Sequence, residues 1–71
     1  MHLKNEKETS EAIEKWRSIS PAVQLSNLKK AIESTELDQM HYEQKENARG
    51  IARCEICLSL LHKRIAELDN F

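Results

Sequence analysis

Residues 50–68, GIARCEICLSLLHKRIAEL, decide the fold of this chain. Apolar side chains recur there at the three- and four-residue spacing of a helix face, and a heptad pattern extends from Leu37 to Leu68. One core position of the heptad holds Leu37, Gln44, Ile51, Leu58 and Ile65. The other holds Met40, Asn47, Cys54, Leu61 and Leu68. Because eight of these ten residues are apolar, the pattern predicts a helix over about residues 37–69.

A second apolar stripe lies on another side of the same predicted helix. Ala52, Ile56 and Leu60 recur every four residues, with Cys57 between the two stripes. An earlier helix of the chain can cover only one of these faces, so the other predicts a surface that binds a protein. The candidate partner-binding residues are Ile51, Ile56, Leu58, Leu60, Leu61, His62, Ile65 and Leu68.

The first half of the chain predicts two shorter helices. Residues 1–9 are almost wholly polar, and we expect them to be frayed or to form a solvated first turn. A helix is expected over residues 10–19, followed by one over residues 21–34 that starts with Ser20 as N-cap and Pro21 as first residue. A proline kink within one longer helix is the alternative. The polar residues 34–38 then predict a break with capping chemistry.

Composition favours an all-α fold. The 71 residues (8.3 kDa) include one Gly and one Pro, and only 4% are aromatic, which disfavours hairpin turns and a sheet core. We expect residues 1–71 to form a single antiparallel helical hairpin of two to three helices. Chains of this size rarely build a sufficient core alone, so we expect a partner or an oligomer to complete it.

Charge and targeting signals are unremarkable. The formal net charge is −1 and the charges are evenly spread, so the composition gives no general field for nucleic acid or an anionic membrane. No signal-like or membrane-spanning run is seen in the sequence, and we expect a cytoplasmic protein without membrane contact.

The residues that could carry chemistry favour packing over catalysis. Cys54 and Cys57 form a C-x-x-C motif with His62 five residues on, but a zinc site needs four ligands, so two packed thiols are the preferred interpretation. We expect no cofactor, no metal and no enzymatic activity. The basic residues Arg49, Arg53, Lys63 and Arg64 are interpreted as a solvated, salt-bridged face, with a phosphate backbone as the alternative partner.

Several segments resemble the small co-chaperones of type III secretion, the YscE-like family. They are residues 25–30 (LSNLKK), a polar break, Tyr42, and the tail EICLSLLH at residues 55–62 that leads to IAEL at 65–68. The resemblance implies a short cytoplasmic helical hairpin. It also implies that the chain binds a larger TPR-like chaperone and, through it, helps to keep a needle subunit unpolymerised before export. The alternative is a homodimeric four-helix-bundle regulator of phage or plasmid type that binds nucleic acid or protein.

Overall fold

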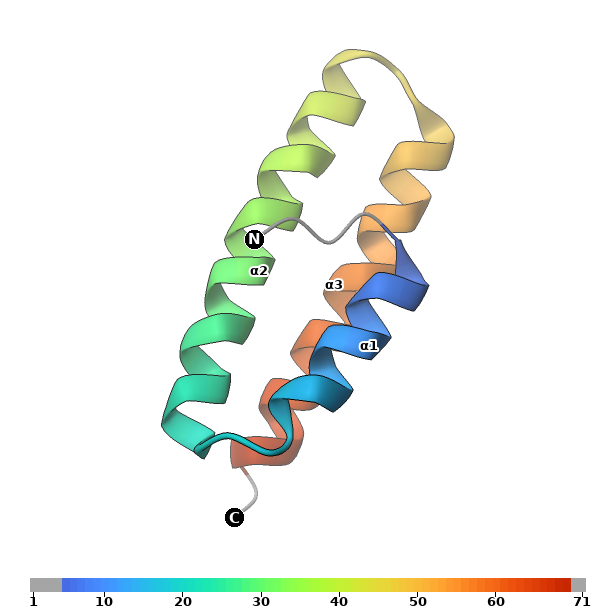
Figure 1. Cartoon of the computed structure of the whole chain (residues 1–71). Helices are drawn as coiled ribbons and strands as arrows, with labels where there is room; N and C mark the ends of the chain where they lie inside the picture. Colours follow the sequence, from blue (N-terminus) through green and yellow to red (C-terminus); the bar gives the residue numbers. More distant parts are fainter. Residues whose placement is uncertain (1–4, 70–71) are drawn as a thin grey trace.

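The chain folds into a helical hairpin with a third helix against its side (Figure 1). The computed structural model describes residues 5–69, in which helices α1 (Glu6–Trp16), α2 (Pro21–Gln44) and α3 (Ala48–Asp69) are joined by short turns and no strand occurs. The molecule is elongated, at 39 × 19 × 18 Å. The predicted all-α hairpin is confirmed, while its completion by a partner stays a prediction. None of the helices described combines the length and the apolar character needed to cross a bilayer.

Helix α1 begins earlier than the sequence predicts. Asn5 is its N-cap, and the Asn5 side-chain oxygen accepts a hydrogen bond from the Glu8 amide at 2.9 Å. The Thr9 hydroxyl donates to the Asn5 carbonyl at 2.9 Å, and Thr9 is fully buried. Residues 6–9 thus form a first helical turn, which was the alternative to fraying, but Thr9 within it is buried and not solvated. Residues 1–4 lie outside the described part. The helix ends at Trp16, so the predicted end at Ile19 is also corrected.

The Ser20-Pro21 pair separates two helices. The Ser20 hydroxyl oxygen accepts a hydrogen bond from the Val23 amide at 3.3 Å, and Pro21 occupies the first turn, where its missing N–H is not needed. Ser20 itself is extended, as the residue before a proline prefers. The predicted start of α2 is confirmed, and the alternative of one kinked helix is excluded.

The predicted break at residues 34–38 does not exist, because α2 runs without interruption to Gln44. Thr35 is buried, and its hydroxyl donates to the Ala31 carbonyl of its own helix at 2.8 Å. A hydroxyl bonded back along its helix no longer competes for the backbone of a new helix start. Capping residues in the sequence thus marked no boundary here.

The hairpin turn lies at residues 45–47, ten residues later than the sequence predicts. Glu46 takes a left-handed conformation with φ 54°, and the Asn47 side-chain oxygen accepts from the Gly50 amide at 3.0 Å, which caps α3. Gln44 and Asn47 therefore flank or form the turn and are not heptad core positions. Leu37 and Met40, also predicted for the core, are 66% and 57% exposed on α2.

The face of α3 that meets α2 is shifted by one residue from the predicted heptad. Its buried positions are Gly50, Cys54, Cys57, Leu61, Arg64 and Leu68. Cys54, Leu61 and Leu68 agree with the prediction, but Ile51, Leu58 and Ile65 are only half-buried at the edge of this face. Small side chains face each other instead, with Ala31 and Thr35 on α2 opposite the α3 cysteines by antiparallel register.

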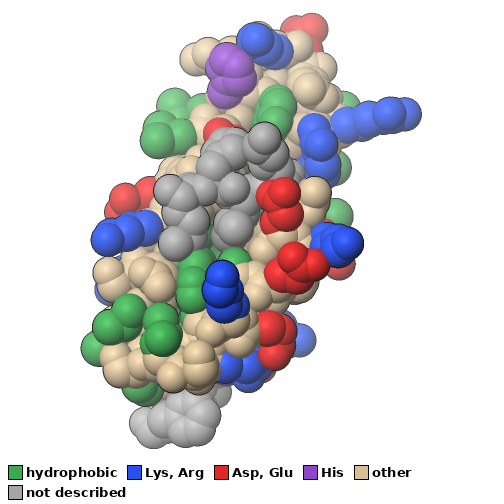
Figure 2. Space-filling model, viewed as in Figure 1, with side chains coloured by type: hydrophobic (Ala, Val, Ile, Leu, Met, Phe, Trp, Pro, Cys, Tyr) green, Lys and Arg blue, Asp and Glu red, His purple; other side chains and the backbone are tan. Residues whose placement is uncertain are grey.

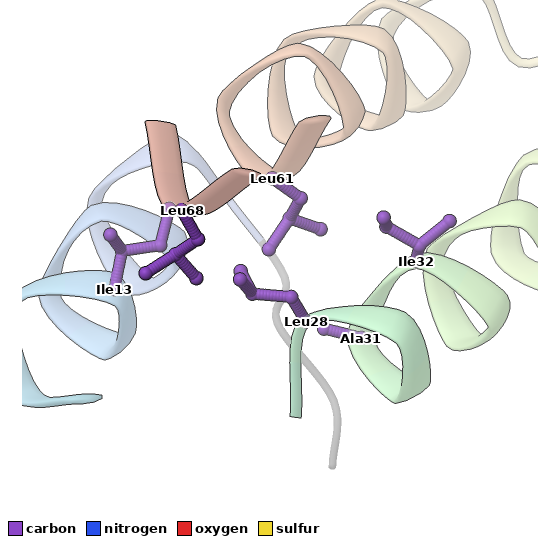
Figure 3. Close-up of a cluster of buried hydrophobic side chains, with 6 residues drawn as sticks. All are labelled: Ile13, Leu28, Ala31, Ile32, Leu61 and Leu68. Atoms are coloured by element: carbon purple, nitrogen blue, oxygen red, sulfur yellow. The ribbon is translucent and has the colours of Figure 1, made fainter. Parts of the chain in front are cut away.

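The aliphatic core lies where all three helices come together, at the end of the hairpin away from its turn (Figure 3). Leu28 and Leu61 are fully buried at its centre. Its six members are Ile13, Leu28, Ala31, Ile32, Leu61 and Leu68. Burying a leucine of this kind stabilises the fold by roughly 1.5–3 kcal/mol. The few aliphatic residues of this core are therefore enough to hold α1 against the hairpin.

Gly50 allows close contact near the turn. A Cβ placed on Gly50 would lie closer to three carbons of the Tyr42 ring than van der Waals contact allows. A glycine at this position therefore leaves the space in which the Tyr42 ring lies.

We predict that Gly50→Ala destabilises the chain by about 1–3 kcal/mol through overpacking against Tyr42. In a Tyr42→Ala background the same substitution should stabilise it by up to about 1 kcal/mol, the helix propensity difference between Ala and Gly. Urea unfolding of the four variants measures both values. An equal effect of Gly50→Ala in the two backgrounds would contradict the contact.

Candidate protein-binding surface

A shallow apolar groove lies on the outer side of α3. Ile56 is 45% exposed there, although it lies in the middle of a long and otherwise well-packed helix. The groove is lined by Ala52, Glu55, Ile56, Ser59 and Leu60. Exposed β-branched side chains flanked by a second aliphatic residue are the kind of surface that binds other proteins.

Helix α1 covers only the second half of this side of α3. A second groove separates the two helices and is lined by Ser10, Ile13, Glu14 and Arg17 of α1 and by Leu60, Lys63, Arg64 and Glu67 of α3. Leu60 lines both grooves, so the exposed surface around Ile56 continues directly from the α1–α3 contact.

The structure divides the predicted partner-binding residues into three groups. Ile56 and His62 are exposed, and Ile51, Leu58, Leu60 and Ile65 are half-buried. Leu61 and Leu68 belong to the intramolecular core, and Leu61 has no exposed surface. The prediction that these two residues contact a partner is therefore corrected, because the hairpin and α1 already cover them. The second apolar stripe, Ala52, Ile56 and Leu60, forms one groove as the spacing predicted.

The basic residues of α3 do not form one solvated, salt-bridged face. Arg49, Arg53 and Lys63 are exposed and make no ion pair with any acidic side chain of residues 5–69. Arg53 lies over the Tyr42 ring, 6.0 Å from its centroid, in a cation–π arrangement. These three cations leave α3 with unneutralised positive charge on its exposed side.

Arg64 is the clearest error of the sequence interpretation, because its side chain is only 10% exposed. Its Nη2 donates to the Gln24 side-chain oxygen across the hairpin at 3.0 Å, and its Nη1 contacts a Glu67 carboxylate oxygen at 3.4 Å. Gln24 in turn donates its amide to the Ile19 carbonyl at 2.8 Å. No periodicity could reveal this pair, since both residues look like surface residues when hydropathy alone is considered.

We predict that Gln24→Leu destabilises the chain by about 2 kcal/mol, because it removes the acceptor of a buried guanidinium. The double variant Gln24→Leu/Arg64→Leu should recover most of that loss, since no buried charge is then unpaired. Thermal and urea unfolding measure both. A double variant no more stable than Gln24→Leu alone would contradict this account.

Cys54 and Cys57 are free thiols buried on the inner face of α3, as the packing interpretation expected. Burial raises the pKa of the Cys54 thiol above its ordinary value, and the Asp38 carboxylate acts in the same direction while Arg53 opposes it. Among the described residues, no three His, Cys, Asp or Glu side chains gather closely enough to hold a metal ion. The inner face of α3 therefore favours the neutral form of the Cys54 thiol.

We predict that this thiol makes folding stability fall in alkaline solution. The native state favours the neutral form, so its contribution is complete below the ordinary thiol pKa of about 8.5 and is lost as pH rises through the higher folded pKa. The free energy of unfolding of the natural chain should thus decrease more steeply than that of Cys54→Ala between about pH 8 and pH 10. Parallel curves would contradict the raised pKa.

Comparison with family models, curated proteins and solved structures gives no match to this chain. The surface on α3 must therefore be judged on its own geometry and charge.

Proposed function

We propose that this chain is a protein-binding helical subunit whose outer α3 face docks on a larger protein. The observation that carries the proposal is the exposed stripe of Ala52, Ile56 and Leu60, which remains uncovered after α1 and α2 have both packed against α3. A helix with one face in a hairpin and a second apolar face in solvent can join that hairpin to another helical surface.

The specific form we propose is a type III secretion co-chaperone. It would bind and stabilise a larger TPR-like chaperone and so help to keep the needle subunit unpolymerised before export. Support comes from the resemblance of residues 55–68 to the YscE-like family and from the hairpin shape. The polar break that the resemblance places between residue 30 and Tyr42 is not present, because α2 runs through it. Stacked helical repeats need a cap at their ends, which a two-faced helix can supply. In this proposal the chain acts by binding and not by catalysis.

A homodimeric helical bundle is the second candidate, and a different surface favours it. Leu37 and Met40 lie one turn apart on α2 and are 66% and 57% exposed. Two copies could cover these residues by pairing their α2 helices. The two candidates thus use different helices, which makes them separable by substitution.

We predict that Ile56→Asp abolishes the hetero-complex while leaving the free chain helical, because Ile56 is already half in solvent in the hairpin. Leu37→Asp is the matched control, since it places the same charge at an exposed aliphatic position on α2. Each variant is co-expressed with a candidate TPR-like chaperone, and light scattering gives the mass of the product. Circular dichroism confirms that both variants stay folded.

The co-chaperone proposal requires a one-to-one complex that forms with Leu37→Asp and not with Ile56→Asp. A natural chain of twice 8.3 kDa that ignores the chaperone and becomes monomeric only with Leu37→Asp would replace it by the homodimer. Assembly that neither substitution changes would contradict both surfaces.

A further inference from the structure

The exposed apolar stripe of α3 is bordered by positive charge. Arg49, Arg53, Ile56, Leu60 and Lys63 follow one another at spacings of four, three, four and three residues, so they share one face of the helix. The three cations have no acidic partner within residues 5–69, while Glu55 is the acidic residue that lines the groove. This combination selects a partner that offers both aliphatic side chains and carboxylates.

The chain already contains a helix that packs along this face of α3, which we call the α3 track. Helix α1 has four glutamates and two lysines in its sequence EKETSEAIEKW, and it buries Thr9 and Ile13 against the body of the protein. Its Ile13 lines the groove opposite Leu60 and Lys63. Glu14 and Arg17 of α1 also line it and pair with each other at 2.9 Å, and Glu67 lies among the α3 residues there. In Figure 2, acidic side chains gather over α1, and basic ones gather over the beginning of α3. The intramolecular contact is therefore one between an acidic amphipathic helix and the side of α3.

The track continues beyond the N-terminal end of α1. Helix α1 has 11 residues and α3 has 22, and Figure 1 shows α1 beside the second half of α3. The uncovered half is about 16 Å long at 1.5 Å per residue, which is room for about three turns of another helix. Leu60 connects the covered and the uncovered parts.

We infer that the first half of α3 binds an acidic amphipathic helix of a partner protein, which extends the path of α1 toward the α2–α3 turn. Its apolar side chains would lie on Ala52 and Ile56, and its carboxylates would face Arg49 and Arg53. The inference rests on the proposed function, since it names the partner chemistry of the same surface. Nucleic acid fits less well, because an exposed isoleucine lies between the cations and the whole chain has a net charge of −1.

The test uses two synthetic helical peptides of 14 residues with identical leucines at the i, i+3, i+4 and i+7 positions. One carries glutamates at the flanking positions, and the other carries lysines there. Fluorescence anisotropy with the full chain should show the acidic peptide binding at least about tenfold more tightly, as expected when several surface ion pairs change sign. Raising the salt concentration should reduce the difference.

Two variants locate the site. Arg49→Glu/Arg53→Glu should reverse the preference between the peptides. Ile56→Asp should weaken the binding of both peptides. Circular dichroism checks that the variants fold, and Lys29→Glu/Lys30→Glu on the exposed surface of α2 is the control with the same change of charge.

Failure of the inference is distinguishable from failure of the proposed function. Equal binding of the two peptides, or binding of neither, overturns the acidic helix, and the proposed function then stands or falls on the chaperone complex alone. Binding of a single-stranded RNA oligonucleotide that Arg49→Glu/Arg53→Glu abolishes and Ile56→Asp leaves unchanged would assign the surface to nucleic acid. A preference that the α2 control removes equally would reduce the effect to net charge and also overturn the inference.

Discussion

The contact between Gln24 and Arg64 determines how the helices of this protein fit together. Arg64 Nη2 donates to the Gln24 side-chain oxygen across the buried end of the hairpin at 3.0 Å. The Gln24 side-chain nitrogen donates in turn to the Ile19 carbonyl, in the connection before α2. One side chain therefore joins α3, α2 and the connection that leads back to α1. At the opposite end, the Tyr42 ring occupies the space over Gly50. Two fixed points on an antiparallel pair leave no freedom to slide, so the register between them follows.

That register divides the seam between α2 and α3 into two parts. Near its middle, Thr35 and the two cysteines are buried, and they bring less volume to the seam than leucines would. At the end away from the turn, Leu28, Leu61 and Leu68 fill it. Ile56 belongs to neither part, since it is 45% exposed, so the apolar stripe is left over after both parts of the seam are packed.

The sequence was sufficient for the helical class and the stripe around Ile56, and at Ser20-Pro21 it favoured a boundary but left a kinked helix as the alternative. It failed on the phase of the heptad, because hydropathy ranks Leu58 and Ile65 above Cys57 and Arg64 as core residues. The predicted and the observed heptad share one core position, at Cys54, Leu61 and Leu68. Their other core position differs by one residue, and only tertiary contacts decide which of the two is buried. Periodicity describes one helix at a time, whereas a buried pair such as Gln24 and Arg64 joins two helices through residues that lie 40 positions apart in the sequence. The same limit explains Thr35, whose hydroxyl could cap a helix or bond within one.

The short length of α1 leaves an apolar surface of α3 exposed while the core remains covered. If α1 covered the whole side of α3, no apolar surface would remain for a partner. If it were absent, Leu61 and Leu68 would lose the cover that Ile13 provides, and a much larger apolar area would meet water. Covering half of α3 leaves a patch centred on Ile56 alone, and patches of modest size are tolerated by monomeric proteins. The cations around it add hydration in the free state and become selective only when a carboxylate-bearing helix replaces that water.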